Sequence, residues 1–207
     1  MRKLFLATLV ATMLGCGLSS CAQKETKNNL DMNKDKAKIL VVFFSKTGEN
    51  YGVGNVTKGN THCLAEIIAE KVGGELFEIK PVNPYPDSYD ECVALAKKEL
   101  NEQARPALKD DIRVEDYDCI FLGYPNWWGN VPMPVYTFME KHNWTGKTII
   151  PFCTHEGSGL SQTEKNIKDA CKGAEVLSGL EMHGTTAQSS RKEAANRVDK
   201  FLKKVGF

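Results

Sequence analysis

The stretch 119–130 constrains the fold of this chain more than any other part of the sequence. It opens with the apolar run 119–122, in which polar and apolar residues do not alternate. Such a run is typical of a strand that is covered on both faces, and therefore of a parallel sheet. Glycines and a proline then interrupt the pattern, and we predict a loop that carries three aromatic residues: Tyr124, Trp127 and Trp128.

A loop in that place is a candidate ligand site, because open α/β sheets bind ligands at the carboxyl ends of their strands. Trp127 and Trp128, beside the flexible Gly129, can form a slot for a flat ring system. The alternative is that the aromatic rings only pack the loop.

Two further apolar runs, 38–44 and 147–153, predict buried strands, although Pro151 argues against a central position for the second. The alternating segment 75–80 predicts an edge strand. Helical periodicity and a last short strand fill the rest of the domain, with helices at 60–72, 88–103, 133–142, 163–171 and 189–205 and a strand at 174–182. This alternation predicts an α/β fold with a doubly wound, five-stranded parallel sheet of order 2-1-3-4-5 and helices on both faces.

Residues 1–20 have the pattern of a signal peptide, with basic residues before an apolar run of suitable length. The run is followed by Leu18-Ser19-Ser20-Cys21, which resembles a bacterial lipobox and implies cleavage before Cys21 and acylation of that residue. We therefore expect an exported lipoprotein, anchored in a membrane of a bacterial envelope. A flexible tether at 21–37 would then precede one domain at 38–207. The alternative is an ordinary signal peptide with a chance cysteine.

Charge and cysteine content exclude some classes of function. The formal net charge is +1, and no basic stripe is evident, so we expect no nucleic-acid partner. Five cysteines follow Cys21, an odd number without a Cys-x-x-Cys pair. We therefore expect neither a zinc site nor a disulfide framework, while a single bridge stays open.

The loop after the first predicted strand has the composition of a phosphate site. Ser45, Lys46 and Thr47 follow the strand, and Asn60 and Thr61 stand where the first helix starts. Free backbone N–H groups and the helix dipole favour an anion at that position. For any one of these residues, a simple helix cap is an equally good interpretation.

Three motifs of other functional classes do not match this sequence. The segment 54–61 nearly matches a P-loop, but Asn60 replaces the lysine that would contact the β- and γ-phosphates. A dinucleotide fingerprint would need a glycine at Thr57. His155 and Ser158 suggest a hydrolase, yet no Gly-x-Ser-x-Gly elbow surrounds either nearby serine.

The third loop, 154–159, follows the strand at 147–153 and is rich in small residues that let backbone approach a ring edge closely. Since all three loops follow parallel strands, they meet at one edge of the sheet. One offers a phosphate site, one aromatic rings and one backbone polar groups. A ligand with one phosphate and a large flat ring fits this set, and we predict flavin mononucleotide (FMN).

With these loops the chain resembles the flavodoxin family over nearly all of 38–207, in particular a bacterial flavodoxin-like lipoprotein subgroup. The resemblance implies a flavodoxin-like sheet, electron transfer through a non-covalently bound flavin, and FMN contacts at Ser45, Lys46, Thr47, Asn60, Thr61, Pro125, Asn126, Trp127, Trp128, Gly129, Thr154, Glu156, Gly157, Ser158 and Gly159. One departure is an insertion at 49–59, whose Tyr51 could fold over the cofactor. The near-neutral charge is a second departure, and it weakens steering toward a charged redox partner.

Three functions of different classes remain open. The leading one is an FMN-binding redox protein with an unknown redox partner. The second is an NAD(P)H-dependent quinone or azo-compound reductase on the same fold, which an open Trp slot would favour. The third is an anchored binding module that keeps the fold without a working flavin.

Overall fold

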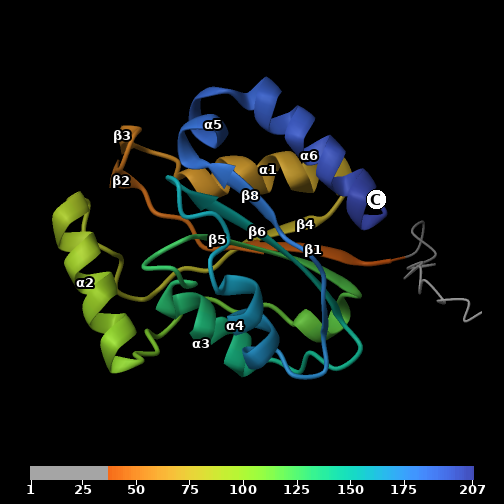
Figure 1. Cartoon of the computed structure of the whole chain (residues 1–207). Helices are drawn as coiled ribbons and strands as arrows, with labels where there is room; N and C mark the ends of the chain where they lie inside the picture. The colour runs from red at the N-terminus through yellow and green to blue at the C-terminus, as the bar shows by residue number, and fades with distance from the viewer. Residues whose placement is uncertain (1–36) are drawn as a thin grey trace, which may run out of the picture.

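The computed structural model describes residues 37–207, in which strands and helices alternate around one sheet (Figure 1). The predicted signal peptide, all of the tether before residue 37 and the proposed lipidation site Cys21 lie outside the described residues. Among residues 37–207, no helix has both the length and the apolar character needed to cross a membrane.

The main sheet is parallel, in the order β4-β1-β5-β6-β7, with β8 also paired to β6. Its strands are β1 (Ile39–Phe43), β4 (Glu75–Glu78), β5 (Cys119–Pro125), β6 (Thr148–His155), β7 (Glu175–Val176) and β8 (Leu180–His183). If β7 and β8 are counted as one interrupted strand, this is the predicted order 2-1-3-4-5. The predicted fold is therefore confirmed, including the edge position of β4.

Helices cover both faces of the sheet. The helices are α1 (Asn60–Val72), α2 (Tyr89–Glu102), α3 (Met133–Lys141), α4 (Thr163–Ala170), α5 (Gly184–Ser189) and α6 (Arg191–Val205), with a short 3-10 turn at Val114–Asp116. Figure 1 shows α1, α5 and α6 on one face, and α3 and α4 on the other. Each face buries its own apolar cluster, so β1, β5 and β6 are covered on both sides, as their unbroken apolar runs indicate.

Strand β5 is longer than predicted, and the expectation that Tyr124 lies in a loop is wrong. The strand continues through Gly123 because its pairing with β6 extends to Pro125 and Thr154. The ring of Phe152 occupies the space that a Cβ of Gly123 would need, only 2.1 Å away. Tyr124 is fully buried, and its hydroxyl donates to Oγ1 of Thr163 at 2.8 Å.

Strand β6 takes a central position despite Pro151, because the strand beside it is interrupted at that point. Strand β7 pairs with Thr148 and Ile149, and β8 resumes the pairing at Phe152. Pro151, which has no N–H to donate, falls between the two paired segments.

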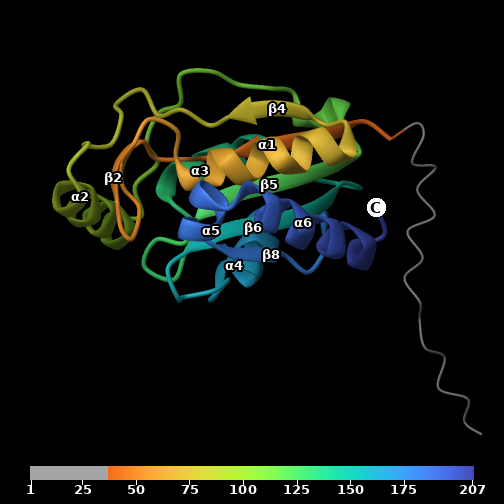
Figure 2. The same cartoon turned by 90° about the horizontal axis from the view of Figure 1, so that it is seen from above.

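Two structural elements were not predicted from the sequence. The insertion forms an antiparallel hairpin of β2 (Gly48–Asn50) and β3 (Gly54–Val56), and α5 follows directly after β8. Figures 1 and 2 place the hairpin and α2 at the same end of the molecule. Backbone N–H of Glu49 donates to the carbonyl of Asp87 at 2.8 Å, which joins the hairpin to the segment before α2.

Candidate functional site

A cleft of ≈ 370 Å³ lies at the carboxyl ends of β1, β5 and β6, where the three predicted loops meet. Its walls come from these loops, the β2–β3 hairpin and the starts of α1, α2 and α5. The lining residues are Ser45, Lys46, Asn50, Tyr51, Asn60, Thr61, Tyr89, Pro125, Asn126, Trp127, Thr154, His155, Glu156, Ser158 and Gly184.

One end of the cleft is formed by the start of α1. Gly59 caps this helix without a side-chain hydrogen bond, and the first turn leaves the N–H groups of Asn60 and Thr61 without intrahelical partners. The next N–H, of His62, donates to Oγ of Ser45 at 3.1 Å. The hydroxyls of Thr61 and Thr154 bond to each other at 2.7 Å, so one of the two hydrogens stays free to donate elsewhere. This end of the cleft presents N–H and O–H donors to an anion.

Lys46 lies in the wall of the cleft, but its ammonium group is held by backbone. Nζ donates to the carbonyls of Thr47 and Glu49 at 2.8 Å each and of Asp87 at 3.1 Å. The residue is only 8% exposed. Lys46 is the only lysine or arginine among the described residues that line the cleft, so its charge favours an anion there while its bonds fix the hairpin.

Asn60 carries a buried acceptor that lacks a hydrogen bond in the described residues, its Oδ1 atom. An unpaired buried oxygen is costly, and a ligand hydroxyl would satisfy it. The amide is confined by Gly184, because a Cβ at that position would lie 2.2 Å from Nδ2 of Asn60. Because Gly184 has no side chain, the Asn60 side chain has room to lie at the cleft.

Another part of the cleft wall is aromatic. The ring of Trp127 makes edge contacts with Phe44 and Tyr85, with ring centroids 5.4 and 4.9 Å apart. Tyr51 and Tyr89, whose centroids are 6.0 Å apart, are 65% and 39% exposed and stand at the mouth of the cleft. Such rings suit a flat, partly exposed ring system.

Burial raises the pKa of the Tyr89 and Tyr85 hydroxyls, and the contact of Tyr85 with Glu99 raises the latter further. Both phenols therefore stay neutral at physiological pH.

Trp128 has a different environment from Trp127. It is not among the residues that line the cleft. It lines a neighbouring cavity of ≈ 260 Å³, together with Val93 and Ala96 of α2. Its ring is half exposed, at 51% for the residue, and Nζ of Lys97 lies 4.4 Å from the ring centroid. Trp127 is thus the tryptophan that faces the cleft.

Asn126 joins two of the loops. Its Nδ2 donates to the carbonyl of Gly159 at 2.7 Å and to Oγ of Ser161 at 3.0 Å, and its Oδ1 accepts from N–H of Gly129 at 2.9 Å. Its own N–H donates to the carbonyl of Thr154 at 2.8 Å. These bonds set the spacing between the aromatic loop and the 156–159 loop.

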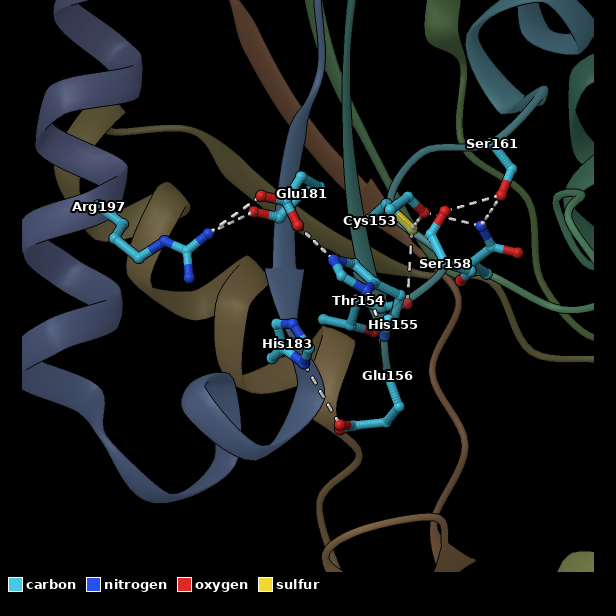
Figure 3. A network of polar contacts seen from close by, with 12 residues as sticks. Cys153, Thr154, His155, Glu156, Ser158, Ser161, Glu181, His183 and Arg197 are labelled. Carbon is cyan, nitrogen blue, oxygen red and sulfur yellow. Dashed lines mark hydrogen bonds and ion pairs between the residues drawn. The ribbon is translucent and has the colours of Figure 1, made fainter.

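Glu156 and His155 connect the third loop to β8 and α5 (Figure 3). Oε1 of Glu156 accepts from N–H of Thr185 at 3.0 Å, and Oε2 lies 3.5 Å from Nδ1 of His183. His155, at the end of β6, contacts Glu181 on β8. No serine in this loop bonds to a histidine in the described residues, so the geometry offers no support for a hydrolase.

Ten of the predicted site residues line the cleft: Ser45, Lys46, Asn60, Thr61, Pro125, Asn126, Trp127, Thr154, Glu156 and Ser158. Five do not line it: Thr47, Trp128, Gly129, Gly157 and Gly159. Thr47 lines a separate cavity of ≈ 360 Å³. Five lining residues were not among the predicted FMN contacts: Asn50, Tyr51, Tyr89, His155 and Gly184. Of these, only Tyr51 was expected near the cofactor, as part of the insertion. Tyr89 was not predicted because it follows the proline-containing segment 81–86, whereas the prediction considered only loops that follow a parallel strand.

The doubly wound sheet, with a cleft lined by polar and aromatic residues at its carboxyl edge, has the arrangement in which open α/β proteins bind ligands. A family model described as flavodoxin matches residues 38–200. The chain therefore belongs to the flavodoxin family. A search of curated protein sequences finds no significant match.

Two similar solved structures come from Bacteroides and are provisionally classed as flavoproteins. The protein of B. eggerthii DSM 20697 is 28% identical, with a TM-score of 0.65 over 83% of this chain and 99% of its own. That of B. uniformis ATCC 8492 is 28% identical, with a TM-score of 0.63 over 79% and 98%. A flavoprotein of Lactobacillus acidophilus NCFM, solved in complex with FMN, shares the fold at 20% identity, with a TM-score of 0.56 over 70% and 93%.

The residues in the cleft fit FMN, the cofactor that family membership supports. The donors at the start of α1 fit a phosphate, the unpaired Oδ1 of Asn60 fits a ribityl hydroxyl, and Trp127 fits a flat ring. The three features occur in that cleft together.

Proposed function

We propose that this protein binds FMN in the cleft and transfers electrons through it. The observation that carries the proposal is that one cleft joins an anion-binding helix start to an aromatic wall. Bound FMN would supply the electron-transfer chemistry. The protein would bind the phosphate through the N–H groups of Asn60 and Thr61 and through the Thr61 hydroxyl, and it would orient the ring against Trp127.

The phosphate assignment can be tested by comparing FMN with riboflavin, which lacks the phosphate. Hydrogen bonds to a charged group contribute about 1.5–3 kcal/mol. Thr61→Ala should therefore raise the Kd for FMN by more than the Kd for riboflavin, measured by quenching of flavin fluorescence. Thr145→Ala, at an exposed threonine before β6, is the control and should change neither Kd. Equal weakening of both ligands by Thr61→Ala would contradict the assignment.

A second candidate is an NAD(P)H-dependent reductase of quinones or azo compounds. The cavity of ≈ 260 Å³ favours it, because Tyr89, Asn126 and Trp127 belong to both this cavity and the cleft. A flat acceptor bound there would lie next to the proposed flavin site. Steady-state oxidation of NADPH that depends on added quinone would favour the reductase; a protein that accepts electrons only from a redox partner protein would favour the carrier.

We further propose that the mature protein is a lipoprotein of a bacterial envelope, attached through acylated Cys21. The proposal rests on the sequence around that cysteine alone. Cys21→Ala should move the protein from the membrane fraction to the soluble fraction. A variant that stays with the membranes, together with a wild-type protein without lipid mass, would contradict it.

A further inference from the structure

His155 is the centre of a chain of polar contacts that starts on α6 and ends in a loop of the cleft (Figure 3). It is the last residue of β6, and its side chain is 3% exposed. Nδ1 accepts a hydrogen bond from N–H of Gly157 at 2.9 Å, and Nε2 contacts a carboxylate oxygen of Glu181.

This geometry determines where the proton of His155 resides. An N–H group can donate only to a nitrogen that holds a lone pair, so Nδ1 is unprotonated. The hydrogen is then on Nε2, which donates it to Glu181. The imidazole is neutral in this arrangement, and its two nitrogens have different roles.

Glu181 is itself held in place from the neighbouring helix. Nη2 of Arg197, on α6, lies 3.2 Å from Oε1 of Glu181 and 3.2 Å from its carbonyl oxygen. The relay therefore runs from α6 through β8 to β6, across two neighbouring strands. It fixes the direction of the Nδ1 lone pair.

We infer that His155 is a positioning residue for the cofactor loop, acting through the N–H group of Gly157. The inference rests on the proposed function, in that the loop 156–159 contacts the bound flavin. Gly157 has φ of +109°, a backbone conformation that few other residues adopt, so this peptide needs a partner to hold it. Glu156 and Ser158, on either side of Gly157, line the cleft.

Protonation of His155 would break this arrangement. With a proton on Nδ1, the ring and the Gly157 N–H would both be donors facing each other, and the loop would have to move. The charged groups that face His155 are Glu181 and Arg197, from β8 and α6. Two titratable neighbours join them: His183, whose ring centroid is 4.7 Å away, and Glu156. Loss of this hydrogen bond in acid should therefore weaken FMN binding.

Two variants separate the roles of the two nitrogens. In His155→Asn, the side-chain oxygen takes the place of Nδ1 and can still accept from Gly157, but it does not titrate. In His155→Gln, the amide nitrogen takes the place of Nε2, and the acceptor for Gly157 is lost. We expect the Kd for FMN at pH 8 to be ~fivefold higher for His155→Gln than for His155→Asn, the value of one neutral hydrogen bond.

The pH dependence is read as the difference between wild type and His155→Asn, because the FMN phosphate also titrates near pH 6. Between pH 8 and 5.5, log Kd should rise more steeply for wild type than for His155→Asn. His183→Asn is the control and should keep the steeper wild-type dependence. Identical slopes for wild type and His155→Asn, or equal Kd values for His155→Gln and His155→Asn, would overturn the inference.

A second measurement does not depend on bound flavin. The ¹⁵N chemical shifts of the His155 ring in the flavin-free protein should report a proton on Nε2 at pH 8, and Glu181→Gln should alter them. A proton on Nδ1 would overturn the inference without bearing on FMN binding. Failure of wild type to bind FMN would instead contradict the proposed function.

Discussion

Replacing Trp127 with alanine should weaken FMN binding and raise the reduction potential of the bound cofactor, because Trp127 faces the cleft. A favourable aromatic pair contributes about 0.5–1.5 kcal/mol beyond its buried area, which corresponds to an increase in Kd of about 2- to 13-fold. If the stack stabilises the oxidised ring by that amount, its loss raises a one-electron potential by about 20–65 mV.

The same substitution should also lower the free energy of unfolding. Trp127 loses its edge contacts with Phe44 and Tyr85, and at about 0.5–1.5 kcal/mol each the loss is about 1–3 kcal/mol. Denaturant unfolding of the flavin-free protein measures this contribution. Trp127→Phe keeps an aromatic ring and serves as the milder variant if the alanine variant does not fold.

Trp128→Ala is the matched control, because Trp128 is half exposed and lines only the neighbouring cavity. It should leave both the Kd for FMN and the potential unchanged. The assays are titration of flavin fluorescence and a redox titration with spectra recorded throughout. A larger effect from Trp128→Ala than from Trp127→Ala, or no effect from either, would refute the assignment of Trp127 to the ring.

Three further predictions concern the surroundings of the cleft and the fold. Lys46→Met leaves three carbonyl oxygens without their ammonium donor, so the free energy of unfolding should fall by about 2 kcal/mol or more, and limited proteolysis should cut the β2–β3 hairpin faster than in wild type. Gly184→Ala puts a Cβ 2.2 Å from Nδ2 of Asn60, so it should weaken FMN binding in a titration and destabilise the fold by about 1–3 kcal/mol; an unchanged Kd would show that Asn60 does not contact the ligand. The hydrogen bond from Arg105 holds the pKa of Glu140 below its usual range, so this pair stabilises the fold above about pH 4.3 and the contribution is lost as pH falls through the lower, folded-state pKa. Glu140→Gln should therefore cost about 1 kcal/mol or less at pH 7, measured by urea unfolding, and progressively less as the pH falls below about 4.3.

The parallel sheet and the place of the cleft could be predicted because they depend on local pattern. Unbroken apolar runs identify β1, β5 and β6, and parallel strands bring the following loops to one edge. The start of α1 was likewise visible from Asn60 and Thr61. These inferences need only the periodicity of the chain and the direction of its strands.

The remaining features depend on contacts between distant residues. In the sequence, Gly123 indicates the end of a strand. In the structure, β5 continues through it, and the absence of a side chain leaves room for the ring of Phe152 in the neighbouring strand β6. The sequence suggests Lys46 as a phosphate ligand, but in the structure its ammonium group donates to backbone carbonyls, including that of Asp87. The partner of His155 stands 26 residues further along the chain, on β8. No local pattern specifies such pairs, because they form only when the sheet brings its strands together.

The absorption spectrum of the purified protein tests the central claim most directly. The account predicts a yellow protein with the absorption bands of a bound flavin, and release on denaturation of FMN, identified by chromatography against FAD and riboflavin. A protein purified without flavin should acquire the same spectrum when FMN is added. A colourless protein that does not take up FMN, or one that releases only FAD or riboflavin, would contradict the account.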